Sequence, residues 1–318
     1  MIPNEPPRRP QLGFLYLPPY RVQGISIAGE ESVVQVPELD LCFDIGLCPR
    51  AVLPCKHVAL THGHMDHVAG LAYYFSQRHF QGMGTGTVVC HPSLEKPLHN
   101  LMRAWVDVEA QRTPYNVVPL APDAELEVKN HHFLRAFATI HTVPSLGFVV
   151  VERRSKLRPE FVGKTQEELL QIKNGGTEIT RILEVPLICY TGDTMRGPHF
   201  DRPDVRAAKI LVTECTFLES GHRDRAKVGR HLHLQDIIEL LDQCEAQWVV
   251  LTHLSRRTHM GLARETLDKH IPKRHRDRVL VLMDSRNNRA RLDHQLAEAG
   301  EQAAARQAAD PGDAVEEG

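Results

Sequence analysis

The sequence has no run of apolar residues long enough to cross a membrane, and its first residues, Met-Ile-Pro-Asn-Glu-Pro-Pro-Arg-Arg-Pro, lack the apolar core of a secretory signal peptide. It also has no Cys-x-x-Cys pair, and its seven cysteines are scattered and odd in number. A disulfide framework and an oxidising compartment are therefore not expected. We predict a cytoplasmic globular protein.

The net charge is small, −2 over 318 residues, but the charges are unevenly distributed. Six acidic residues and one arginine fall within residues 297–318, so the rest of the chain is net basic. This tail is rich in Ala, Gln, Glu and Gly and has no apolar period, which predicts disorder. The length of 318 residues suits one large α/β domain or two small ones, and the hydrophobic content of 42% is ordinary for a globular protein.

The most informative stretch is Thr-His-Gly-His-Met-Asp-His at residues 61–67. Its ligand-type side chains belong to His62, His64, Asp66 and His67. Their spacing does not follow one face of a helix, so a tight loop must turn them toward a common centre. Residues 58–61 are β-prone and residues 68–75 suit a helix, which places this loop at the carboxyl end of a buried strand. Because imidazole and carboxylate suit zinc and similar ions, a metal site explains the cluster better than chance among 19 histidines.

Other ligand-type residues also follow short apolar runs that predict strands. Runs at 137–140, 185–190, 209–213 and 248–252 lead into His141, the turn that contains Asp193, Glu214 and His253, respectively, and the run at 41–43 leads into Asp44. Taken singly, each could be a turn former or an ordinary core or surface residue. Strands that are apolar throughout are buried on both faces. We therefore expect their ends to converge on one rim and to complete the metal site.

Helical periodicity separates these strands. Leu234, Ile237, Ile238 and Leu241 follow the i, i+3, i+4, i+7 pattern, and residues 261–270 predict another helix. Strands and helices in this arrangement predict an α/β layered sandwich.

These motifs resemble the metallo-β-lactamase superfamily and, within it, ribonuclease Z, the tRNA 3′-processing endonuclease, in its short plant-type form. The resemblance rests on Phe43-Asp44-Ile45-Gly46, the His62 loop, His141 with Gly147-Phe148, Tyr190-Thr191-Gly192-Asp193-Thr194, Glu214-Cys215-Thr216-Phe217-Leu218, His231-Leu232-His233-Leu234 and Thr252-His253-Leu254-Ser255-Arg256. It implies a four-layer αββα sandwich with a short inserted arm. The implied division is an N-terminal segment 1–23, a hydrolase domain 24–294 that contains the insert 152–184, and an acidic tail 295–318.

The resemblance also implies roles for individual residues. His62, His64 and His141 would hold one Zn²⁺, Asp66, His67 and His253 would hold the other, and Asp193 would bridge them; Mn²⁺ or another divalent ion could replace zinc. His231 is implied as the general acid, oriented by Glu214, and Asp66 would also steer the proton of the nucleophile. Because Leu232 and His233 follow His231 where many bacterial members have Ser, His233 stays an alternative acid.

The insert 152–184 corresponds to the arm that grips the tRNA elbow in ribonuclease Z. It carries five of the six candidate RNA-binding residues, namely Arg153, Arg154, Lys156, Arg158 and Lys173. The sixth, Arg256, lies three residues after the predicted ligand His253. A helical hairpin that packs on the body is the alternative to an arm.

The function we expect is a zinc-dependent endoribonuclease that removes 3′ trailers from precursor tRNA and acts as a homodimer. One alternative is a hydrolase of the same fold that acts on a small phosphodiester or ester. Another is an RNA-binding module with a vestigial metal site.

Overall fold

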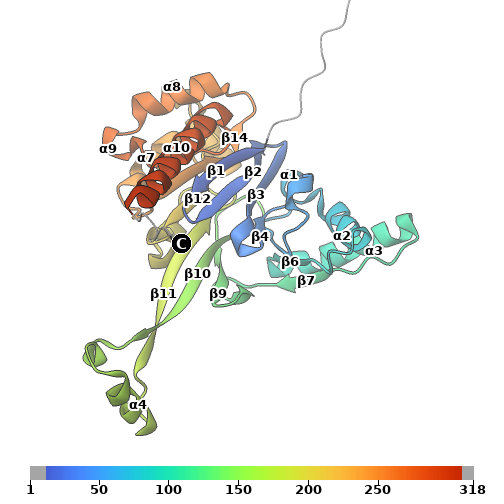
Figure 1. The fold of residues 1–318 in the computed structure, drawn as a ribbon. Helices are drawn as coiled ribbons and strands as arrows, with labels where there is room; N and C mark the ends of the chain where they lie inside the picture. The colour runs from blue at the N-terminus through green and yellow to red at the C-terminus, as the bar shows by residue number, and fades with distance from the viewer. Residues whose placement is uncertain (1–11, 310–318) are drawn as a thin grey trace, which may run out of the picture.

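The computed structural model describes residues 12–309, and it arranges them around two β-sheets (Figure 1). The first sheet has the order β1-β2-β3-β4-β5-β6-β7 with β14 beside β2, and its strands are β1 Gly13–Leu17, β2 Tyr20–Ala28, β3 Glu31–Val36, β4 Leu41–Phe43, β5 His57–Ala59, β6 Thr87–Cys90, β7 Asn116–Pro119 and β14 Leu254–Ser255. The second has the order β15-β13-β12-β11-β10-β9-β8, and its strands are β8 Glu125–Lys129, β9 His132–Ala138, β10 Leu146–Leu157, β11 Thr180–Tyr190, β12 Ile210–Glu214, β13 Trp248–Thr252 and β15 Val279–Val281.

The two sheets pack face to face through a shared apolar core. Val34 and Phe43 from the first sheet lie in one buried cluster with Phe148 and Tyr190 from the second. The rings of Phe43 and Tyr190 stack with their centroids 4.9 Å apart. Burial of such side chains is the main term that stabilises the sandwich.

Helices cover the outer face of each sheet. Side chains of α2 and α3 join the apolar cluster on the first sheet, and those of α5, α7 and α8 join the cluster on the second. The helices are α1 Met65–Val68, α2 Leu71–Phe80, α3 Glu95–Glu109, α4 Gln166–Asn174, α5 Pro203–Arg206, α6 Arg223–Gly229, α7 Leu234–Leu241, α8 Met260–His270, α9 Lys273–Arg276 and α10 Ser285–Ala309, with short 3-10 helices η1 Pro37–Leu39, η2 Arg50–Val52, η3 Pro92–Leu94, η4 Pro159–Phe161, η5 Pro198–Asp201 and η6 Ser220–His222. The predicted αββα sandwich is confirmed, and so are the helices predicted from residues 234–241 and 261–270. No helix within residues 12–309 is long and apolar enough to cross a membrane.

The N-terminal residues that are described belong to the first sheet. Strands β1 and β2 form an antiparallel pair in which Gly13 lies opposite Gly24. A Cβ atom at Gly24 would lie 2.0 Å from the backbone oxygen of Val33, so the chains approach there as closely as glycine allows. The predicted boundary between residues 23 and 24 therefore falls inside β2. Residues 1–11 lie outside the described residues.

The C-terminal region also differs from its prediction. Helix α10 runs through residues 297–309, where the composition predicts disorder. Ala, Glu and Gln are strong helix formers, and they extend a helix that begins at Ser285 and contacts β1. The part of the predicted disordered tail at 310–318 lies outside the described residues.

The insert forms an arm made mainly of two strands. β10 and β11 stay paired as far as Leu157 and Thr180, and they carry η4 and α4 away from the body of the molecule (Figure 1). A reciprocal capping box between Thr165 and Glu168 begins α4, and Gly175 is its C-cap. The alternative of a helical hairpin packed on the body is therefore wrong.

Candidate metal centre

The strand ends converge as predicted, and they bring all seven candidate ligands together. The loop after β5 supplies His62 and His64, the short helix α1 that follows supplies Asp66 and His67, and the residues after β9, β11 and β13 supply His141, Asp193 and His253. Among the described residues, five groups of three have their ligand atoms within 4.8 Å of one another, and two of these groups include His231. The other three contain only candidate ligands: His62, His64 and His141; Asp66, His67 and His253; and His62, His67 and Asp193. Among these three groups, His62 and His67 are each shared with the one that contains Asp193.

The orientation of the imidazoles fits bound metal better than mutual hydrogen bonding. Nδ1 of His64 lies 3.0 Å from Nε2 of His62 and 3.3 Å from Nε2 of His141. Nε2 of His67 is buried and has no hydrogen-bond partner among residues 12–309, although Oδ2 of Asp193 lies 3.4 Å away. A buried nitrogen without a partner is costly unless an ion occupies its lone pair. Imidazole nitrogen and carboxylate oxygen are the donors that zinc and related divalent ions take.

The pKa values of the candidate ligands shift in different directions. Burial alone would lower the pKa of His67, but the carboxylates of Asp193 and Asp44 outweigh it and hold that pKa well above its ordinary value. Burial lowers the pKa of His62 to about 2, so its ring is neutral and has a free lone pair. Burial alone would raise the pKa of Asp193, but the rings of His253 and His67 outweigh it and hold that pKa well below its ordinary value. A neutral imidazole beside an ionised carboxylate is the state that binds a cation.

A second layer of contacts fixes the ligands, and Asp44 is its centre. Oδ2 of Asp44 lies 2.8 Å from Nδ1 of His67 and accepts a hydrogen bond from the hydroxyl of Tyr190 at 3.1 Å. Its Oδ1 accepts from the backbone N–H of Thr61 at 2.7 Å. Sequence reasoning identified Asp44 as a strand end but gave it no role. The Asp-Ile-Gly turn directly after a strand was the signal that could have found it.

The buried Glu214 and the partly buried His231 form a pair beside the ligand cluster. Nδ1 of His231 lies 2.9 Å from Oε1 of Glu214. The carboxylate also accepts from the backbone N–H of Thr194 at 2.7 Å and from the hydroxyl of Thr216 at 2.5 Å. Burial opposes protonation of His231, but Glu214 outweighs it and raises the pKa to about 9. A protonated imidazole with Nδ1 held in place can donate from Nε2.

The alternative acid, His233, has a different surrounding. Its side chain caps α7: Nδ1 accepts from the backbone N–H of Gln235 at 3.1 Å, and Nε2 lies 2.9 Å from the backbone oxygen of Glu219. Both ring nitrogens are thus engaged with the backbone. The geometry favours His231 as the acid.

The candidate RNA-binding residues occupy three different settings. Arg153 bonds to Glu125 and Glu184 near the base of the arm, and Arg154 bonds to Glu152, so their charges are locally compensated. Lys156, Arg158 and Lys173 lie on the outer ribbon and α4, and Arg158 pairs with Glu178 at 3.4 Å. Arg256 lies in the loop after β14, and its Nη1 is 3.7 Å from Oε1 of Glu30. The next residue, Arg257, lines the cavity beside His231. Arg257 was not among the predicted RNA-binding residues, because nothing in the sequence distinguishes it from Arg256.

Comparison with known proteins agrees with this geometry. A family model described as the beta-lactamase superfamily domain matches residues 46–254. The chain is 34% identical to a chloroplastic tRNase Z of Arabidopsis thaliana over 79% of this chain and 72% of that protein. It is 31% identical to a second tRNase Z of the same plant over 75% of this chain and 86% of that protein. Among solved structures, the short form of human tRNase Z superposes with a TM-score of 0.55 at 18% identity, covering 86% of this chain and 96% of that one.

The contact between Asp44 and His67 leads to a test of metal affinity. Asp44→Asn removes the negative charge that orients the ring of His67, and affinity for Zn²⁺ should fall about 10- to 100-fold. Competition against a chelator of known affinity measures the change. Asp242→Asn is the control, because Asp242 pairs with Arg274 on the surface and should bind zinc like wild type. Unchanged affinity in Asp44→Asn would show that this carboxylate does not support the centre.

Proposed function

The chain belongs to the tRNase Z (ribonuclease Z) family of the metallo-β-lactamase superfamily, and we propose that it is an endoribonuclease that removes 3′ trailers from precursor tRNA. The observation that carries the proposal is the Glu214–His231 pair beside a complete ligand set. A vestigial metal site would not retain every ligand together with a poised acid. The relatives named tRNase Z favour RNA over a small ester as substrate.

The fold implies a divalent metal, and the described residues fit two zinc ions. His62, His64 and His141 would hold one, Asp66, His67 and His253 the other, and Asp193 would lie between them. Such ions activate water and stabilise negative charge on a phosphodiester. Mn²⁺ or another divalent ion with the same ligand preferences could replace zinc.

Side chains of the protein would then donate and accept the protons of the reaction. Products with a 3′-hydroxyl on the tRNA require a proton for the leaving 3′ oxygen, and His231 holds one at neutral pH because Glu214 raises its pKa. Glu214 acts as a positioning residue, since three donors fix its own carboxylate. Asp66 has one oxygen held by the backbone N–H of Gly29 at 2.9 Å, and we assign it the proton of the attacking water.

The direct test is cleavage of a precursor tRNA transcript with its product ends mapped. Wild type loaded with zinc should release a trailer with a 5′-phosphate and a tRNA with a 3′-hydroxyl. His231→Ala should slow the single-turnover rate about 10²- to 10⁴-fold, because general acid catalysis is worth that much, and Asp66→Ala should abolish cleavage. Matched zinc contents for wild type and His231→Ala provide the control. Absence of trailer release by zinc-loaded wild type would reject the function.

The arm is proposed to bind tRNA away from the reacting phosphate. The side chains of Lys156 and Lys173 have no hydrogen bond or ion pair within the described part of the chain, so their charges are available to a polyanion. Replacing residues 158–179 by a two-residue Asn-Gly turn keeps the pairing of Leu157 with Thr180. This variant should cleave precursor tRNA at least about 10-fold less efficiently, through a higher KM, because a shift of about 1.4 kcal/mol in binding is tenfold.

Hydrolysis of bis(p-nitrophenyl) phosphate is the control for the arm variant. It should be retained, because that substrate is too small to reach the arm. Equal loss of both activities would argue that the arm stabilises the body rather than binds tRNA.

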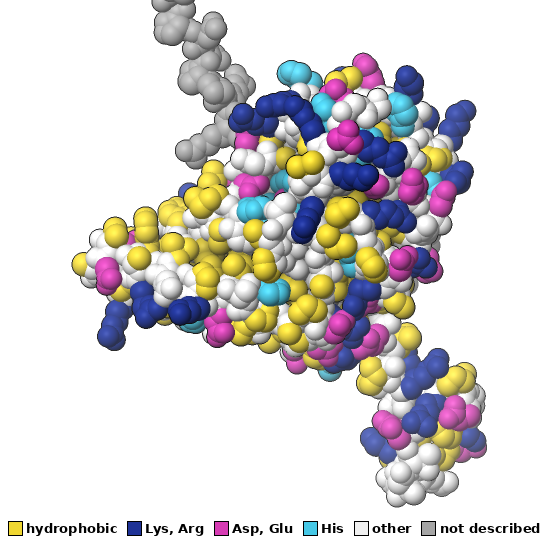
Figure 2. All heavy atoms as spheres, turned by 180° about the vertical axis from the view of Figure 1, so that it is seen from behind, with side chains coloured by type: hydrophobic (Ala, Val, Ile, Leu, Met, Phe, Trp, Pro, Cys, Tyr) yellow, Lys and Arg dark blue, Asp and Glu magenta, His cyan; other side chains and the backbone are white. Residues whose placement is uncertain are grey.

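A homodimer is the proposed assembly. Figure 2 shows hydrophobic side chains on the projection formed by α2 and α3, where Tyr73, Leu101, Trp105 and Val108 are exposed. Such a patch is typical of an interface. Sedimentation should give a dimer for wild type and a monomer for Trp105→Glu, with Val162→Glu on the arm as a matched control that stays dimeric. A monomeric wild type would contradict this assembly.

A further inference from the structure

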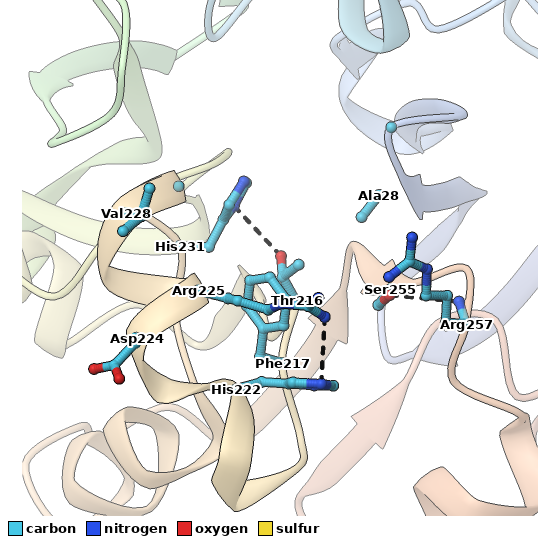
Figure 3. A pocket seen from close by; sticks show the side chains of 12 residues that line it. Ala28, Thr216, Phe217, His222, Asp224, Arg225, Val228, His231, Ser255 and Arg257 are labelled. Carbon is cyan, nitrogen blue, oxygen red and sulfur yellow. Dashed lines mark hydrogen bonds between the residues drawn. The ribbon is translucent and has the colours of Figure 1, made fainter.

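A cavity of about 660 Å³ lies directly beside His231 (Figure 3). Its walls come from the turn after β2, from the segment 216–231 that includes α6, and from the loop after β14. Two of its lining residues also contact the candidate metal ligands. The backbone N–H of Gly29 donates to Asp66, and the hydroxyl of Thr216 lies 3.0 Å from Nδ1 of His253. The cavity therefore adjoins the candidate metal centre.

The walls combine flat apolar surface with positive charge. The ring of Phe217 lies between those of His222 and His231, with centroid distances of 5.8 Å and 6.2 Å. Arg225 reaches in from α6, where its Nη1 lies 3.4 Å from Nε2 of His222, and Arg257 lies on the opposite side (Figure 3). An aromatic face flanked by guanidinium groups suits a nucleobase and its phosphates.

The position of the acid decides which nucleotide this would be. His231 protonates the leaving oxygen, and that oxygen is the 3′ oxygen of the last nucleotide that stays on the tRNA. A cavity adjoining His231 therefore lies on the tRNA side of the cleaved bond rather than on the trailer side. Resting on the function proposed above, we propose that this cavity binds the base of that last retained nucleotide. Phe217 is its stacking platform, and Arg225 and Arg257 contact the adjoining phosphates.

Abasic substrates test this assignment without altering the protein. An abasic site at the last retained nucleotide should lower kcat/KM about 5- to 150-fold, because stacking of one base on an aromatic side chain contributes about 1–3 kcal/mol. An abasic site at the first trailer nucleotide should have a much smaller effect. Phe217→Ala should show a comparable loss on the intact substrate and almost no further loss on the first abasic substrate. Phe217→Tyr, which keeps the ring, should restore cleavage.

Binding without turnover provides an independent readout. A product RNA that ends in 2-aminopurine should lose fluorescence on binding wild type, because stacking quenches that base, and should lose less on binding Phe217→Ala. Additive losses in the cleavage experiment, or equal effects of the two abasic sites, would overturn the assignment while trailer release still supported the endonuclease. No cleavage of any precursor by wild type would reject both the endonuclease and this assignment.

Discussion

The carboxylate of Asp193 is buried at a point where four imidazole rings meet. Nitrogens of His253, His67, His62 and His231 lie 3.3, 3.4, 4.0 and 4.0 Å from its Oδ2. A buried carboxylate is costly unless charge or hydrogen bonds compensate it. Cations held between these groups would satisfy both the carboxylate and the ring nitrogens. The surrounding structure can be understood as the means of holding these side chains together.

The fold holds these side chains together by placing them at the ends of its strands. Parallel strands β11, β12 and β13 terminate at one edge of the second sheet, and β5 terminates at the facing edge of the first. Each strand is anchored by apolar side chains in the core, so the polar residue that follows it has little freedom to move. Asp44 adds rigidity, because it links the His67 ring to Thr61 and to Tyr190 across the two sheets. Ligand geometry is thus set by core packing as much as by the ligands themselves.

Much of this centre could be predicted from the sequence, because the apolar runs of the strands and the ligand-type residues that follow them are visible in the order of the residues. The ligand loop after β5 and the strand ends before His141, Asp193 and His253 are local patterns, and the structure brings these residues together. The turn after a strand marks Asp44 as a candidate, but its contact with Tyr190, which is 146 residues away in the chain, is visible only in the structure. The choice between His231 and His233 likewise depends on which ring caps α7 and which ring meets Glu214.

The ion pairs of the arm and the structure of the terminal segments were also less predictable, because they depend on contacts that the local sequence does not show. Arg153 and Arg154 carry the charge expected of RNA contacts, but Glu125 and Glu184 compensate Arg153, and Glu152 compensates Arg154. Residues 13–23 belong to paired strands of the first sheet, and residues 297–309 continue a helix. Both outcomes depend on tertiary contacts or on helix propensity rather than on hydrophobic period.

The most direct test of the central claim is anomalous X-ray diffraction at the zinc edge from crystals of the zinc-loaded protein. The account predicts two peaks for each chain, one against His62, His64 and His141 and the other against Asp66, His67 and His253, with Asp193 contacting both. A single peak, or peaks outside this cluster, would contradict it.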